Sequence, residues 1–493
     1  MHLHPDPDRV AATLFLPGQE HAAGGASRSS AVMDRLLALD ESEVHAELDL
    51  LRASFGSRHR GLDRLWLSNF ALVQHRLPDG SEPSADLRLL LGATFTQEYA
   101  IESVALFNPS MVEHPDQDGA PAGGTRFVMS ARGVGEGHVS SIELRTGTVD
   151  ATGSVVLDPA PEVVVLPRAV PSTWLRDDFA LQLADMGGDR TNSDFVLESL
   201  PEEFARADLD VALESLREQR LTRGAAVRTI DRFEALVAAS YQVEFPEDST
   251  VSERVLMPRS AMESHGMEDL RLVRLLLDGG GYEYVGTYTA YDGSRISSHL
   301  LRTLDFRRFT VRRLSGPGAR DKGLALFPRT IRGRYVALSR TDRESNGISS
   351  SHDLLHWTRP EIVARPERPW EAVQLGNCGS PIETPAGWLV LTHGVGPMRT
   401  YSIGAMLLDL DDPSRVIGRL REPLLAPDPD ERSGYVPNVV YSCGALLHGR
   451  DLVMPYGCSD TTSRIALVEL APLLAELLST SGTTTHDPMT EHA

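Results

Sequence analysis

The chain has 493 residues and a formal net charge of −21, and its content of 41% hydrophobic and 24% charged residues is that of an ordinary globular protein. The acidic balance argues against nucleic acid as the main partner, because phosphate backbones are bound by clustered Lys and Arg. No run approaches the ~18 apolar residues of a membrane span, and the N-terminus lacks a signal-peptide pattern. We therefore expect a cytoplasmic protein.

Helical spacing of apolar residues dominates the first hundred positions, over residues 30–55, 62–77 and 84–105. Pro109 then breaks the pattern, and the chain alternates in strand fashion to about residue 171. Helix returns over about 191–239, strands follow from 255 to 470, and 471–478 form a short closing helix. The Ser/Thr-rich tail from 479 is expected to be disordered.

The strand-rich part contains an internal repeat. Aligned isoleucines stand at intervals of 52, 55 and 62 residues, and an earlier valine stands 157 residues before the first of them. In chain order these positions are Val139, Ile296, Ile348, Ile403 and Ile465. Five units of about 50 residues indicate a five-bladed β-propeller, with a β-sandwich as the alternative.

The predicted fold class is therefore mainly β, a five-bladed propeller with an N-terminal helical region and a helical insertion. The expected domains are 1–104, the helical region; 105–190, the first blade; 191–250, the insertion; 251–470, the remaining blades; and 471–493, the closing helix and tail. Three widely spaced cysteines, Cys378, Cys443 and Cys458, predict buried small side chains rather than a disulfide framework or a zinc site. No metal site is expected.

A propeller places function at the axial mouth, where inner strands begin, so polar residues at equivalent blade positions are the candidates for the site. They are Asn108, Arg132, Asp269, Arg271, Lys322, Arg340, Glu383, His393, Tyr435 and Tyr456.

Asp269 is the candidate general acid, because a carboxylate in a dry pocket can hold a proton near neutral pH. Arg271, two residues on, would share its strand face. Alternatively, Glu268 and Asp269 cap the strand or pair with Arg271 at the surface.

Four groups that carry or can carry positive charge lie at the ends of different predicted strands. Together they could bind an anion. They are Arg132, Lys322, Arg340 and His393. Each alone is also compatible with a solvated strand end.

Several motifs resemble glycoside hydrolase family 130, the β-mannoside phosphorylases and their hydrolytic relatives. They include FNPS at 107–110, MSAR at 129–132, MEDLR at 267–271, LALFPR at 324–329 and GSPIETPAGWLVLTHGV at 379–395. The resemblance covers about 105–170 and 255–468, and leaves both helical regions outside the minimal propeller.

The resemblance implies a five-bladed propeller and an inverting reaction in which inorganic phosphate, with no metal or organic cofactor, attacks a terminal β-mannosyl unit. The products would be α-mannose 1-phosphate and a shortened acceptor. Asp269 would be the general acid, acting through a sugar hydroxyl. The implied phosphate ligands are Arg132, Lys322, Arg340, His393 and Tyr456, and the implied sugar ligands are Asn108, Arg271, Glu383 and Tyr435.

Two alternatives remain open at this point. A β-mannosidase on the same scaffold would use Glu383 or Glu344 to activate water, although Glu383 can also be read as a turn acid. A noncatalytic sugar-binding propeller would use its helices to recruit a partner. The helical additions are also candidates for contacts between copies of the chain.

Overall fold

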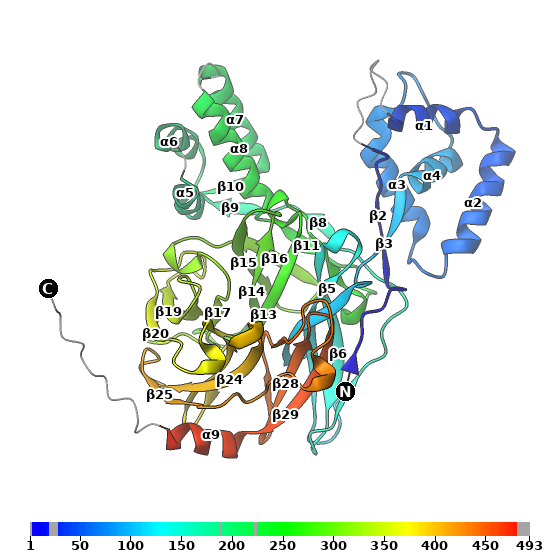
Figure 1. Cartoon of the computed structure of the whole chain (residues 1–493). Helices are drawn as coiled ribbons and strands as arrows, with labels where there is room; N and C mark the ends of the chain where they lie inside the picture. The colour runs from blue at the N-terminus through cyan, green and yellow to red at the C-terminus, as the bar shows by residue number, and fades with distance from the viewer. Residues whose placement is uncertain (1, 19–27, 188, 221–223, 481–493) are drawn as a thin grey trace. The chain divides into compact units, whose positions relative to one another are not determined.

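The computed structural model describes residues 2–18, 28–187, 189–220 and 224–480 (Figure 1). Residues 481–493 of the tail that was predicted to be disordered lie outside the described residues. The chain divides into a smaller unit, residues 6–103 with 161–166, and a larger unit that holds the rest. Strands predominate in the larger unit, as the sequence predicts.

Helices form most of the smaller unit. In its described part they are α1 (Arg28–Leu37), α2 (Glu41–Phe55), α3 (Leu62–Val73) and α4 (Ala85–Thr94). The run predicted as one helix over 30–55 is two, because Asp40 accepts a hydrogen bond from the amide of Glu43 and caps α2. The helix predicted over 84–105 ends at Thr94, and β3 (Thr96–Ala100) then pairs with β2 (Val10–Leu14).

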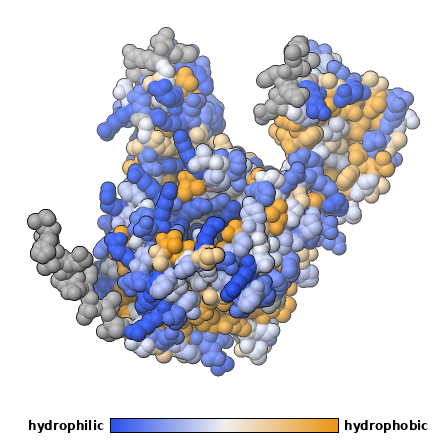
Figure 2. All heavy atoms as spheres, viewed as in Figure 1, coloured by the Kyte–Doolittle hydropathy of each residue, from blue (hydrophilic) through white to orange (hydrophobic). Residues whose placement is uncertain are grey.

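Apolar side chains also reach the surface of this smaller unit, where Figure 2 shows broad hydrophobic areas. The exposed members are Phe15, Leu16, Leu50, Leu67 and Leu72. The face of the larger unit in the same view is mostly hydrophilic.

Antiparallel groups of strands follow one another along the larger unit, and we number these sheets in chain order. The first holds β4 (Ala105–Glu113), β5 (Thr125–Val134), β6 (Ser140–Val149) and β7 (Val155–Leu157). The second holds β13 (Gly266–Leu276), β14 (Tyr282–Tyr291), β15 (Ile296–Thr303) and β16 (Arg308–Arg313). One parallel residue pair, Gly266 with Ser140, joins these two sheets.

The remaining sheets repeat the pattern. The third holds β17 (Ala325–Leu326), β18 (Tyr335–Ser339), β19 (Asn346–Ser351) and β20 (Glu361–Ala364). The fourth holds β21 (Gln374–Asn377), β22 (Ile382–Thr384), β23 (Gly387–Val395), β24 (Tyr401–Leu408) and β25 (Val416–Arg419). The fifth holds β26 (Val440–Tyr441), β27 (Leu446–His448), β28 (Asp451–Cys458), β29 (Thr462–Glu469) and β1 (His2–Leu3).

The sequence repeat corresponds to this succession of sheets. The aligned isoleucines lie in β15, β19, β24 and β29, and Val139 directly precedes β6. Each of these strands is the third along its sheet. Helix α9 (Leu470–Ser479) then closes the chain where a short helix was predicted.

The helical insertion begins earlier than expected. Helix α5 (Arg176–Asp185) lies within the range assigned to the first blade, and it is followed by α6 (Arg190–Ser199), α7 (Arg206–Arg220) and α8 (Gly224–Ala238). Two short strands, β9 (Thr173–Leu175) and β10 (Glu203–Ala205), pair within the insertion. Its own core includes Phe179, Phe204 and Phe233.

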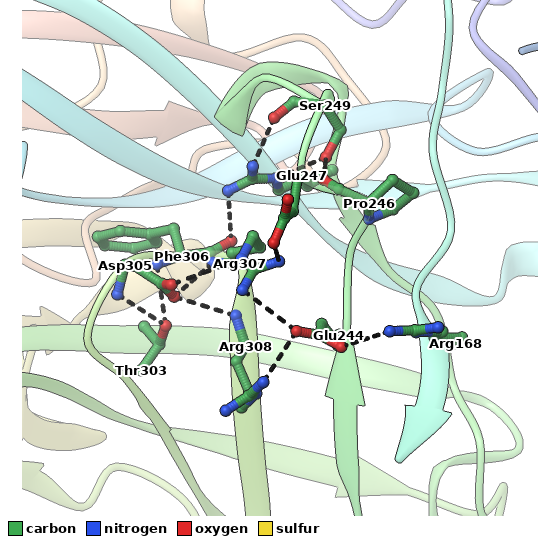
Figure 3. Close-up of polar contacts among 11 residues, drawn as sticks. Arg168, Glu244, Pro246, Glu247, Ser249, Thr303, Asp305, Phe306, Arg307 and Arg308 are labelled. Atoms are coloured by element: carbon green, nitrogen blue, oxygen red, sulfur yellow. Dashed lines mark hydrogen bonds and ion pairs between the residues drawn. The ribbon is translucent and has the colours of Figure 1, made fainter.

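The insertion leaves and re-enters the larger unit through paired strands. Strand β8 (Arg168–Val170) pairs with β11 (Gln242–Glu244), which in turn pairs with β16. Figure 3 shows Glu244 of β11 between arginines of both neighbours: Arg168 donates to it at 2.8 Å and Arg308 at 2.9 Å. These hydrogen bonds lower the pKa of Glu244, so the carboxylate stays charged where the insertion joins the sheet.

Short 3₁₀ turns precede the second, fourth and fifth sheets, and each of these three ends in a buried glutamate. One of them is Ala261–Glu263, ahead of β13, and Ser260 and Glu263 form its capping box. The Glu263 carboxylate also accepts hydrogen bonds from the hydroxyls of Tyr241, at 3.0 Å, and Tyr288, at 2.5 Å. This residue therefore ties the turn to the insertion exit and to the second sheet.

Replacing Glu263 with Ala should lower the free energy of unfolding by roughly 3 kcal/mol or more, because five donors lose their acceptor at ~1–3 kcal/mol each. They are the hydroxyls of Tyr241, Tyr288 and Ser260 and the backbone amides of Arg259 and Ser260. Urea unfolding of the variant measures the change. Glu247→Ala is the control, because that side chain is 87% exposed and should stay within about 0.5 kcal/mol of the parent. Equal effects of the two substitutions would contradict this assignment.

Candidate active site

Asn108 and Asp269 face each other from two distorted strands. The pairing register shifts in β4 between Phe107 and Ser110 and in β13 between Glu268 and Arg271. At these bulges Asn108 has φ 51° and Asp269 φ 57°, a region that non-glycine residues seldom occupy. The amide of Asn108 donates to Oδ1 of Asp269 at 2.8 Å. Bulges of this kind often redirect a side chain next to a functional site.

The bulge corrects the prediction that Asp269 and Arg271 share one strand face. Strict alternation ends at Glu268, so the spacing of two no longer decides which way the side chains point. The buried guanidinium of Arg271 donates to three oxygens. They are the backbone oxygen of Asp269, the backbone oxygen of Cys378 and the hydroxyl of Tyr441.

Glu268 gathers two of the predicted anion ligands. Arg132 from β5 donates to one of its carboxylate oxygens at 2.8 Å, and Lys322 from the connection before β17 donates to the other at 2.7 Å. Arg132 also lies 3.7 Å from the Asp269 carboxylate and over the Phe107 ring. A cation of the first sheet and one of the connection before the third sheet therefore meet a pair of largely buried carboxylates.

These cations decide the charge of Asp269. Burial acts to raise its pKa, but the charges of Arg132, Arg271 and Lys322 and the Asn108 hydrogen bond together bring the pKa below its usual value. Asp269 is thus ionised in this state. This differs from the expectation, drawn from the residues alone, of a carboxyl group that holds its proton near neutral pH.

Arg340 and His393 form the adjoining part of the site. A guanidinium nitrogen of Arg340 lies 3.0 Å from Nε2 of His393, and the side-chain amide of Gln374 lies at the same distance from that ring nitrogen. Arg340 also lies close to the segment that carries Lys322. A Cβ built on Gly323, the next residue after Lys322, would lie 3.7 Å from the Cβ of Arg340. Burial, with the charges of Arg340 and Arg271, holds the pKa of His393 well below its usual value. His393 is therefore a neutral imidazole rather than a fourth cation.

Four buried polar atoms of these residues and of neighbouring Asn377 have no hydrogen-bond partner within the described part of the chain. They are Oδ1 of Asn108, Nε of Arg340, Oδ1 of Asn377 and Nδ1 of His393. Native proteins leave few buried polar atoms unpaired, and the exceptions call for an explanation. Both a donor and acceptors are available here, which suits a ligand with phosphate oxygens and sugar hydroxyls.

The sequence argument missed Asp460. It stands in the turn between β28 and β29, where Ser459 and Asp460 both have positive φ, 47° and 48°. Burial, reinforced by the negative charges of Asp269 and Glu268, raises its pKa to about 6 against the influence of Arg132 and Arg399. In the sequence Asp460 is marked by its position just ahead of the last repeated strand. Aspartates are common at strand ends, so this position does not single it out as a site residue.

The structure places three other candidates differently. Tyr456 is buried, and its hydroxyl donates to Glu431 at 2.8 Å, away from the cations. Glu383 makes a two-pronged surface ion pair with Arg329 at 2.8 Å. Tyr435 is 60% exposed and stacks on the ring of His138 at 5.6 Å. Its amide donates to Thr461, beside Asp460.

The described residues contain no group of three His, Cys, Asp or Glu that could hold a metal ion. Among these residues there is also no helix long and apolar enough to span a bilayer. The three cysteines are all buried, as predicted.

Comparison with known proteins identifies the family. The profile of glycoside hydrolase family 130, described as beta-1,4-mannooligosaccharide phosphorylase, matches residues 238–477. A 1,2-beta-oligomannan phosphorylase of Thermoanaerobacter sp. (strain X514) is 36% identical over 224 residues, 44% of this chain and 72% of the relative. A beta-1,2-mannobiose phosphorylase of Listeria innocua is 32% identical over 231 residues, 45% of this chain and 63% of the relative. The chain belongs to glycoside hydrolase family 130.

Among solved structures, the chain also matches the β-1,2-mannobiose phosphorylase from Listeria innocua in complex with β-1,2-mannobiose. It has 22% sequence identity and a TM-score of 0.46, and the match covers 77% of this chain and 93% of that one.

Replacing Asp460 with Asn should stabilise the protein above pH 6. The pKa of the Asp460 carboxyl is higher in the folded than in the unfolded protein. The parent therefore loses stability as pH rises from about 4 to about 6, and it does not regain that stability at higher pH. A shift of about two pKa units corresponds to ~3 kcal/mol. Thermal unfolding from pH 4 to 8 should show the gap between variant and parent widening across this window. A gap that does not depend on pH would refute the assignment.

Proposed function

We propose that the protein catalyses inverting phosphorolysis of terminal β-mannosides. An oxygen of inorganic phosphate attacks the anomeric carbon, the glycosidic C–O bond breaks, and the leaving oxygen takes a proton. The products are α-mannose 1-phosphate and a shortened acceptor sugar. The observation that carries the proposal is the meeting of Arg132 and Lys322 beside Asp269. The phosphorylase names of the relatives support it.

A closed five-bladed propeller is part of this proposal. The first and fifth sheets are joined by hydrogen bonds: Leu106 donates to Thr461 and Ser463 donates to Leu106, each at 2.9 Å. The site also draws on every sheet. Its members, from first to fifth, are Asn108 and Arg132, Asp269 and Arg271, Arg340, His393, and Asp460. Convergence of residues from successive sheets is what an axial site in a ring would require.

We assign the roles from these positions. Asp269 supplies the proton to the leaving oxygen, relayed by a sugar hydroxyl. Arg132, Lys322 and Arg340 bind phosphate, and neutral His393 lies against the Arg340 guanidinium and helps to orient it. Asn108, Arg271 and Asp460 border the mannosyl unit, and exposed Tyr435 is placed to contact the acceptor. Tyr456 and Glu383 receive no role, because they face Glu431 and Arg329.

Phosphate binding should give Asp269 its proton. Arg132 and Lys322 hold the pKa of this carboxyl down in the anion-free state. An anion that neutralises both cations removes that influence, and burial then raises the pKa. The nucleophile and the acid would thus be made ready by the same event.

Incubation with β-mannobiose and phosphate should yield mannose 1-phosphate, with no turnover when phosphate is withheld. Asp269→Asn should lower kcat by roughly 10²–10⁴-fold, the usual contribution of a general acid. Glu383→Gln is the matched control and should act like the parent. Release of free mannose without phosphate, lost in Glu383→Gln, would establish a hydrolase instead.

Sulfate binding at pH 7 should take up protons, because sulfate carries the charge of phosphate but does not titrate in this range. Calorimetry in buffers of different ionisation enthalpy measures the uptake, which should be clearly smaller in Asp269→Asn. Lys322→Ala should weaken sulfate binding itself. Sulfate binding without proton uptake by the parent protein would contradict the linkage.

A further inference from the structure

The helical insertion contacts the segment that carries Lys322. Residues 314–324 run between β16 and β17. Asp185, the last residue of α5, accepts a hydrogen bond from the Gly316 amide at 3.3 Å and another from the Arg313 guanidinium at 3.1 Å. Its side chain is only 13% exposed. One carboxylate of the insertion therefore holds both the strand end and the start of this segment.

The place of Asp185 in its helix is otherwise unfavourable. The carbonyl end of a helix carries partial negative charge, so acidic residues belong in the first turn. Helix α5 has Asp177 and Asp178 there and no basic residue in its last turn. Asp185 adds a negative charge at the wrong end. Its contacts with Gly316 and Arg313 account for that charge, whereas the helix alone does not.

The segment between Gly316 and Lys322 has little freedom to absorb a shift. Gly316 has φ 90°, and a Cβ there would lie 2.3 Å from the carbonyl oxygen of Trp357. Further along, Gly318 donates to that same oxygen, and Ser298 donates to the backbone oxygen of Asp321 at 2.8 Å. The backbone from Gly316 to Asp321, the neighbour of Lys322, is thus held by close contacts and hydrogen bonds along its length.

We propose that Asp185 is a positioning residue that sets Lys322 for phosphate, so that the helical insertion controls the affinity of the phosphate site. The inference rests on the proposed phosphorolysis. Lysine carries its ammonium group on a four-carbon stem of limited length, so the position of the Lys322 backbone limits where that group can lie. A misplacement of about 1 Å is enough to impair an active site.

The test compares initial rates at varied phosphate for the parent, Asp185→Ala, Asp185→Asn and Lys322→Ala. Asp185→Ala should raise the KM for phosphate about tenfold and leave kcat within about twofold, the pattern of lost ground-state binding. Asp185→Asn should raise the KM for phosphate less, because the oxygen of the asparagine side chain can still accept the hydrogen bond from the Gly316 amide. Lys322→Ala should raise the KM for phosphate most.

Asp177→Asn is the matched control, because this aspartate lies on the same helix with a side chain that is 90% exposed. It should keep the parent KM. A wild-type KM for phosphate in Asp185→Ala, or an equal loss of kcat and kcat/KM, overturns the inference. The inference is also overturned if Asp185→Ala raises the KM for phosphate only together with a lower Tm, while a fully folded Asp185→Asn keeps the parent KM. Turnover without phosphate in every variant would instead overturn the proposed function.

Discussion

The paired contacts of Glu268 with Arg132 and Lys322 are the interaction on which the rest of the site depends. Taking charges out of water is costly unless they are matched, and here one carboxylate matches one cation of the first sheet and one of the connection between the second and third sheets. Glu268, on the second sheet, thereby ties the first sheet and that connection together at a single point. In the proposed mechanism an incoming phosphate must share these cations with Glu268, so competition within the protein sets its affinity.

The carboxylates that this network surrounds stand on distorted backbone. Asp269 and Asp460 both have positive φ, and each such residue costs of order 1–3 kcal/mol. A regular strand would alternate and send neighbouring side chains to opposite faces. The bulge in β13 instead lets Glu268 bind the cations while Asp269 receives the amide of Asn108. The strained backbone of the site thus lowers local stability, and the packing of the surrounding sheets offsets that loss.

The sequence predicted the repeat, the succession of sheets and the gathering of Arg132 and Lys322, because period-2 patterns and repeat spacing are local properties. It could not predict the bulge at Asp269, since nothing in the strand pattern marks an extra residue. It could not fix the protonation of Asp269, which it allowed to hold a proton, or of His393, which it allowed to carry positive charge, because a pKa depends on neighbours from other sheets. Asp460 was missed for the same reason, and Tyr456 was misplaced because alternation does not say which face looks toward the site.

The distribution of charge explains why one site can serve both an anion and an acid. Glu268, Asp269 and Asp460 lie near Arg132, Arg271 and Lys322, and Arg340 and Arg399 add further positive charge. Positive groups therefore outnumber the carboxylates before any ligand arrives, which favours an anion. A dianion would take up that excess, and the carboxylates beside it would lose the influence that holds a pKa down. In the proposed mechanism the carboxylate that then takes up a proton is Asp269, because it lies beside Arg132.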